Sequence, residues 1–180
     1  VNGFNCSYMT VSQSEELLTQ KVGAYVLTID TRNNGQESIT AKQAGLSYDS
    51  DGSVDKLIRN QDRFTWFLAF NQHRNYEVSS SIKYDEQKTE AAISELKCMQ
   101  QENMTEPSDA HIEEKDDKFV IVPEQEGTAL KPEKTSQDII DALVTGRTPV
   151  DLEADGCYKE PKVYQSDEIL TKNCDLINKL

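Results

Sequence analysis

Two stretches of the chain carry the same predicted order of elements: a helix, a β-hairpin, a glycine corner and a second helix. The first stretch opens with a helix predicted at Thr10–Val22, and the second opens with a helix predicted at Tyr84–Met99. Gly45 and Gly127 hold the same position relative to the second helix of their own stretch. Repetition of a whole supersecondary unit is typical of architectures that bind or space other molecules. The sequence therefore predicts an α+β fold with an internal duplication, made of two helix-plus-hairpin units.

Turn residues and alternating patterns locate the two hairpins. Tyr25–Asp30 alternates apolar with polar residues, and Glu37–Ala41 returns after Asn33-Asn34-Gly35, a strong hairpin turn. In the second stretch, Ala110–Glu114 and Lys118–Val122 flank an acidic turn in the same way. Because hairpins join antiparallel strands, we expect a mainly antiparallel sheet.

Capping residues mark the ends of several helices. Thr10 and Gln13 have the spacing of a capping box at the start of the first helix. Pro132 is placed to open a later helix, and Gly146 is placed to end it. A last helix is predicted at Ser166–Leu180, with Ser166 as its cap.

The order of elements also suggests a division of the chain. We expect a first α+β unit at residues 1–78, a second at 79–160 closed by a strand at Thr148–Leu152, and a C-terminal helix at 161–180. The two units either form subdomains that meet near residue 78 or share one sheet. Val1 is not a natural start, and the last helix runs to the end of the sequence without a stop signal, so we expect the chain to be a piece of a longer protein.

The charge of the chain limits its partners. The formal net charge is −13, which argues against nucleic acid and against anionic lipid surfaces as partners. No phosphate loop, dinucleotide fingerprint or zinc-type cysteine spacing occurs, so no cofactor and no metal are expected. The carboxylates between Asp49 and Asp55 do not follow the calcium-loop pattern, because the glycine is fourth rather than sixth.

Four cysteines lie far apart in the sequence, at Cys6, Cys98, Cys157 and Cys174. Cys98 and Cys157 end elements of the second unit, so either they form a disulfide in an exported protein or both are free buried thiols. Cys157 is not expected to be a nucleophile. It has no neighbouring His to lower its pKa, and the nearby Asp155 would raise that pKa.

One aromatic cluster is a candidate ligand-binding site. Trp66 lies within three residues of Phe64 and Phe67, and Phe70 follows. Exposed aromatic rings stack on sugars or dock a partner domain, whereas buried rings would cover the edge of the first unit. Trp66, Phe64 and Phe67 are therefore weak candidates for ligand contact, and burial remains the competing interpretation.

Several segments resemble one family of exported cell-wall modules. The opening VNGFNCSYMTVSQSEELL is similar to the start of these modules, with Tyr8 in place of the usual Gly and Ser14 in place of a frequent Ala. The segments Pro107–Leu130 and Asp151–Pro161 resemble the family most strongly. The family comprises the peptidoglycan-binding domains that precede the catalytic domain of Gram-positive L,D-transpeptidases, with related modules in VanW-like wall proteins.

This resemblance implies a non-catalytic module that acts in the cell wall. It implies an extracellular location, a membrane anchor before the sequence, and an L,D-transpeptidase domain after it that forms peptidoglycan cross-links. The expected partners are peptidoglycan, through its glycan or its stem peptide, and the transpeptidase domain of the same chain. The alternative is a purely structural spacer or interaction domain that packs on its own catalytic domain, with the helix at 161–180 as the connection.

Overall fold

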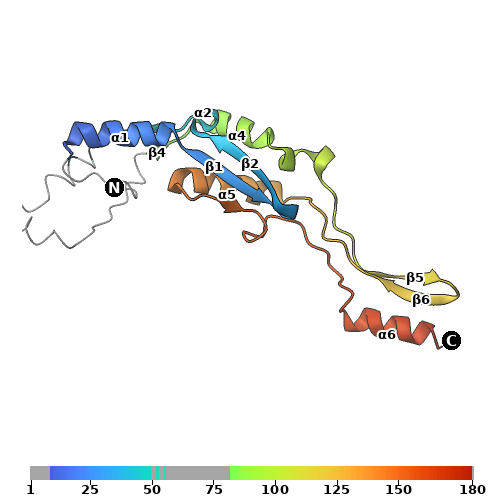
Figure 1. The fold of residues 1–180 in the computed structure, drawn as a ribbon. Coiled ribbons are helices and arrows are strands. Elements are labelled where there is room, and N and C mark those ends of the chain that lie inside the picture. Colours follow the sequence, from blue (N-terminus) through green and yellow to red (C-terminus); the bar gives the residue numbers. More distant parts are fainter. Residues whose placement is uncertain (1–8, 50–51, 53–54, 56–81, 180) are drawn as a thin grey trace, which may run out of the picture.

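A three-stranded sheet, covered on one face by helices, forms the body of the molecule (Figure 1). The structure is a computed structural model that describes residues 9–49, 52, 55 and 82–179. Helices and small, mainly antiparallel sheets alternate along the chain, so the predicted α+β class is confirmed.

The central strand of the main sheet is β1 (Val26–Thr31). It pairs antiparallel with β2 (Gly35–Thr40) and parallel with β7 (Val150–Asp151). The β1–β2 hairpin matches the prediction, but the parallel pair does not follow from hairpin signals. It brings two segments together that are about 120 residues apart, as shown by the Thr28 amide, which donates to the Thr148 hydroxyl over 3.1 Å.

The predicted signals for helix ends are largely confirmed. Helix α1 (Val11–Gly23) starts at the Thr10–Gln13 capping box. Helix α5 (Pro132–Thr145) starts at its proline and ends at Gly146, which has a φ of 74°. A left-handed residue after the last turn suits glycine, which has no Cβ to clash there.

The helix predicted at residues 84–99 is shorter than expected. Helix α4 (Glu86–Ser94) is capped by Asp85 and is followed by the 3-10 turns η4 (Lys97–Met99) and η5 (Gln101–Asn103). The carboxylate of Glu37 accepts the amide N–H groups at 97 and 98 over 2.7 and 2.8 Å. This contact, made by a strand residue remote in sequence, stabilises the change of direction after α4.

The short elements between β2 and α4 complete this half of the molecule. Helix α2 (Ala41–Ala44) follows β2 and has its own capping box, and β3 (Ser47–Tyr48) pairs antiparallel with β4 (Ile82–Lys83). The hydroxyl of the fully buried Thr89 on α4 donates to the carbonyl of Ala44 over 2.9 Å, which ties α4 to α2.

One core joins residues from both predicted units. Leu27, Ile29 and Ile39 of the sheet are fully buried against Ile139 and Leu143 of α5. The cluster also includes residues of α4 and of the segment after β7: Ala92, Ile93, Leu96, Leu152, Cys157 and Tyr158. Residues of both stretches therefore contribute to one core, and β7 joins β1 and β2 in one sheet.

The second hairpin lies apart from this core. Strands β5 (His111–Lys115) and β6 (Lys118–Val122) form their own two-stranded sheet and contact helix α6 (Glu168–Ile177). Extended segments carry this hairpin and α6 to one end of the molecule (Figure 1). We call residues 111–122 and 168–177 the hairpin–α6 arm, and Cys174 is its one buried residue.

Two expectations need correction here. Asp167, and not Ser166, caps α6, because its carboxylate accepts the amide N–H groups of Ile169 and Leu170 over 2.8 and 3.0 Å. The duplication is not shown: one hairpin belongs to the core sheet, and the other forms a two-stranded sheet of its own. The boundary at residue 78 lies outside the described residues. No helix in the described ranges is long and apolar enough to cross a membrane.

Candidate functional site

A polar groove with a volume of about 530 Å³ opens at the end of the β1–β2 hairpin. Three segments line it: the end of β1, the turn η1 (Arg32–Asn34) with the start of β2, and β7 with the loop that follows it. The lining residues are Asp30, Thr31, Arg32, Asn33, Asn34, Gly35, Gln36, Asp151 and Glu153. All except the glycine carry hydrogen-bonding side chains, so the groove suits a polar ligand.

The turn residues place two amide side chains at this groove. Asn33 and Asn34 have φ values of 65° and 59°, a left-handed conformation that asparagine tolerates better than most residues. Both side chains are exposed. The Asn-Asn-Gly turn predicted from the sequence therefore also supplies part of the lining.

Arg32 fixes the shape of the groove from one side. Its guanidinium makes a bidentate ion pair with Glu153, with N–O distances of 2.5 and 2.6 Å. It also donates to the carbonyls of Glu126 and Gly127 over 3.0 and 2.7 Å and lies over the ring of Tyr158 at 4.3 Å. Only 12% of the side chain is exposed. We call this set the Arg32 clamp.

The charges in the clamp stabilise one another. The hydrogen bond from Arg32 lowers the pKa of Glu153, and the same bond raises the pKa of Arg32. Burial raises the pKa of Tyr158, whose hydroxyl accepts the backbone N–H of Arg32 over 2.7 Å. The side chain of Arg32 thus binds one carboxylate and two backbone carbonyls, and it acts as a structural anchor for the hairpin end.

In two carboxylates of the groove, those of Asp30 and Asp151, only one of the two oxygens accepts a hydrogen bond. Asp30 and Asp151 are paired neighbours in the parallel register, so their side chains leave the sheet on the same face. One oxygen of Asp30 accepts from the Gln36 amide over 2.7 Å. One oxygen of Asp151 accepts the backbone N–H groups of Glu153 and Ala154, both over 3.0 Å.

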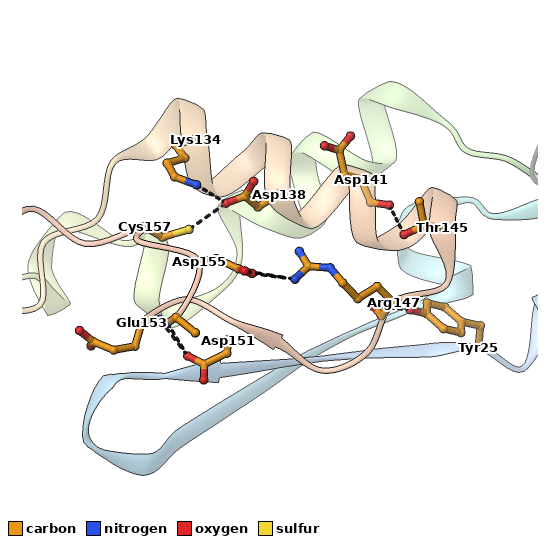
Figure 2. Close-up of polar contacts among 11 residues, drawn as sticks. Tyr25, Lys134, Asp138, Asp141, Thr145, Arg147, Asp151, Glu153, Asp155 and Cys157 are labelled. Atoms are coloured by element: carbon orange, nitrogen blue, oxygen red, sulfur yellow. Dashed lines mark hydrogen bonds and ion pairs between the residues drawn. The ribbon is translucent and has the colours of Figure 1, made fainter.

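A second polar cluster connects α5 to the loop after β7 (Figure 2). Asp138 accepts from Lys134 over 2.7 Å and from the thiol of Cys157 over 3.2 Å. Burial raises the pKa of Asp138, but the hydrogen bonds from Lys134 and Cys157 outweigh it, so the net shift is downward. Burial and the Asp138 carboxylate raise the pKa of Cys157 to about 11. The thiol is therefore protonated at neutral pH and is a poor nucleophile.

Arg147 holds the other end of this loop. Its guanidinium pairs with Asp155 over 2.9 Å, and its carbonyl accepts the hydroxyl of Tyr25 over 3.1 Å (Figure 2). These contacts, with the Asp138–Cys157 bond, place the loop that carries Asp151 and Glu153 against α5. The second cluster thus supports the groove without lining it.

The site residues suggested from the sequence do not coincide with the groove. Trp66, Phe64 and Phe67, together with Phe70, lie outside the described residues. Cys98 and Cys157 are both free thiols, so the disulfide considered from the sequence is not formed in this structure. Burial raises the pKa of Cys98 to about 12, with a further contribution from Glu37.

Sequence reasoning missed the groove for a physical reason. The Asn33–Gly35 turn was visible, but nothing local shows that Asp151 pairs beside Asp30. The sequence predicts a strand at Thr148–Leu152, and β7 forms there, but no local signal identifies β1 as its partner. Within residues 9–49 and 82–179, no group of three or more His, Cys, Asp or Glu side chains could hold a metal ion.

Comparison with known families adds one finding. A family model described as "Putative peptidoglycan binding domain" matches residues 37–151. Of the residues that line the groove, only Asp151 lies within the matched range, and the turn at residues 32–34 precedes that range. No curated protein and no solved structure matches the chain.

Proposed function

Because the chain belongs to the family described as putative peptidoglycan binding domains, we propose that it is a non-catalytic cell-wall module whose hairpin-end groove binds peptidoglycan. The family model covers residues 37–151, more than half of the 180 residues, and this match supports a wall ligand for the module. Such a ligand implies an extracellular location.

The composition of the groove supports this ligand class. Peptidoglycan presents sugar hydroxyls, acetamido groups and peptide amides, which exchange hydrogen bonds with amide and carboxylate side chains. Asn33, Asn34 and Gln36 provide both donors and acceptors at the groove. The clamp keeps this end of the hairpin rigid, so less conformational freedom is lost on binding.

We further propose that the module precedes an L,D-transpeptidase-like catalytic domain of the same protein and positions it at the wall. The similarity of residues 107–130 and 151–161 to modules of such enzymes supports this arrangement. The protonated, carboxylate-bound thiol of Cys157 supports a non-catalytic role for the described part of the chain.

The hairpin–α6 arm favours a second candidate function, that of a spacer or interaction domain. Ile169 and Leu176 lie two helical turns apart on α6 and are 70% and 61% exposed. The opposite face, with the buried Cys174, packs on the second hairpin. An exposed apolar stripe on a packed helix is consistent with contact to a following domain.

Cosedimentation with purified sacculi tests the first proposal. The double variant Asn33→Gly/Asn34→Gly removes both amide side chains and keeps the left-handed backbone accessible. We expect it to bind on the order of tenfold more weakly than the unchanged chain, because each lost hydrogen bond contributes about 1 kcal/mol.

The second hairpin offers a matched control. Asp116 and Asp117 also have left-handed φ values, 53° and 58°, so Asp116→Gly/Asp117→Gly makes the same backbone change away from the groove. This control should bind sacculi at least as well as the unchanged chain. Equal loss in both double variants would remove the groove from the proposal, and no binding by the unchanged chain would favour the spacer function.

A further inference from the structure

We infer that the groove recognises a free primary ammonium group, such as the one carried by the diamino residue of a stem peptide that has not been cross-linked. The inference rests on the proposed peptidoglycan-binding function and names the chemical group that the same groove would select.

The parallel register sets the two carboxylates side by side. Ile29 and Val150 are paired and fully buried, so Asp30 and Asp151, the next pair, lie on the opposite, solvent-facing side of the sheet. Neighbouring strands are about 4.8 Å apart. A single cation between the strands would therefore be within reach of both side chains.

Each carboxylate has one oxygen in use and one available. In both residues Oδ1 accepts the hydrogen bonds that hold the local structure. Among the residues that the structure describes, Oδ2 of Asp30 and Oδ2 of Asp151 have no hydrogen-bond partner. An ammonium group has three donors and no acceptor, so two carboxylate oxygens and one amide carbonyl satisfy it.

The charges around this pair leave the groove negative. Arg32 is the one cation of the lining, and its guanidinium is occupied by Glu153 and two backbone carbonyls. Asp30 and Asp151 have no cationic partner among the described ion pairs. The carboxylate of a stem peptide would be repelled here, whereas an ammonium group would be attracted.

Selection of an ammonium group would make binding sensitive to the cross-linking of the wall. Cross-linking converts the primary amine of the acceptor strand into an amide, which removes the positive charge. A groove that selects the ammonium form would therefore favour uncross-linked stem peptides over cross-linked ones. The module would place its protein where acceptor strands are still available.

Chemical acetylation of sacculi gives a direct test, because it neutralises free amines and leaves the glycan in place. We expect the unchanged chain to cosediment with untreated sacculi and to bind on the order of tenfold more weakly after acetylation. The variant Asp30→Asn/Asp151→Asn keeps an oxygen for the local hydrogen bonds and removes both charges. It should bind untreated and acetylated sacculi equally weakly.

A charge-matched control is available on the second hairpin. Glu113→Gln/Glu114→Gln also removes two exposed carboxylates but lies far from the groove, and it should retain the sensitivity to acetylation. Equal binding of the unchanged chain to both sacculus preparations would overturn the amine inference and leave the proposed function intact. Absence of binding to untreated sacculi would overturn the proposed function itself. An equal loss in the control would assign the effect to overall charge and would also overturn the inference.

Discussion

The β1–β2 and β5–β6 hairpins have similar turns and very different surroundings. Each turn contains two consecutive non-glycine residues with left-handed φ values, at 33–34 and at 116–117. β1 contributes fully buried side chains to the core, whereas every residue of β5 and β6 is exposed or intermediate. The turn thus forms a hairpin in both places, but only tertiary contacts determine whether that hairpin becomes part of the core.

The contacts at the hairpin ends explain the difference. The first hairpin is held at its tip by the Arg32 clamp and along one edge by β7. The second contacts α6 and Asn178, the C-cap of that helix; the Asn178 side chain accepts the Phe119 amide N–H and donates to the Phe119 carbonyl, both over 2.8 Å. The tip of the first hairpin is held by many contacts, as a binding groove requires. The second hairpin has fewer contacts with the core, as is typical of a segment that contacts another domain.

Isoleucine truncation should give the largest contrast between the hairpins. Ile29 is completely buried, so Ile29→Ala should lower the free energy of unfolding by about 2–5 kcal/mol. Ile121 in β6 is only partly buried, and Ile121→Ala should cost about 1 kcal/mol. Urea denaturation followed by circular dichroism measures both. Similar losses would show that the second hairpin is as well anchored as the first.

Loss of the clamp should have the next largest effect. Arg32→Ala removes a bidentate ion pair, two bonds to carbonyls and a ring contact, and we expect a loss of about 2–3 kcal/mol in unfolding free energy. Arg147→Ala is the control, because its side chain is 46% exposed and pairs with one carboxylate. It should cost less than about 1 kcal/mol. If Arg32→Lys were as stable as the unchanged chain, the forked geometry would not matter.

Changes at the two turns should have small effects on stability. Asn33→Gly/Asn34→Gly and Asp116→Gly/Asp117→Gly relieve left-handed strain but increase the freedom of the unfolded chain. We expect each to alter the unfolding free energy by less than about 1 kcal/mol, measured by thermal melting. A large loss for the first pair alone would mean that the Asn33 and Asn34 side chains stabilise the fold, so its binding defect could not be assigned to ligand contact.

Protonation of Glu153 in acid should lower the unfolding free energy by a still smaller amount, because it breaks the ion pair with Arg32 at the first hairpin. The folded-state pKa of Glu153 lies below its ordinary value of 4.5. Its stabilising contribution is therefore fully present above about pH 4.5 and is lost as the pH falls towards the lowered value. Because 54% of this side chain is exposed, solvent screening keeps the effect modest. Melting curves between pH 6 and 3 should show a steeper decline for the unchanged chain than for Arg32→Ala, and parallel declines would contradict the assignment.

The features that could be predicted from the sequence are those encoded within a few residues. The capping box at Thr10, the proline start and glycine stop of α5, and both hairpin turns depend on neighbours in the chain. The Arg32 clamp and the β1–β7 pair depend on residues about 95 to 126 positions away. No local pattern marks Arg32 as partly buried, so the groove could not be located without the fold.

Contacts between residues that are distant in sequence also determine the chain path after α4 and the different roles of the two stretches. The turn η4 after α4 is bound by Glu37, which lies 60 residues before the Lys97 amide that it accepts. Equal spacing of Gly45 and Gly127 suggested equivalent units, yet Gly127 supplies a carbonyl to the clamp while Gly45 ends α2. Equivalent positions in sequence thus have different roles in the structure.

The parallel pairing of β1 with β7 also determines the order in which the sheet can be completed during synthesis. A nascent chain has finished β1 and β2 long before Val150 is added. At about 5–20 residues per second, the interval of some 120 residues lasts roughly 6–24 s. Throughout that time the β7-facing edge of β1 has unpaired backbone groups, which are a template for pairing with other chains. Any arrest of translation before Val150 would release a chain that cannot close its own sheet.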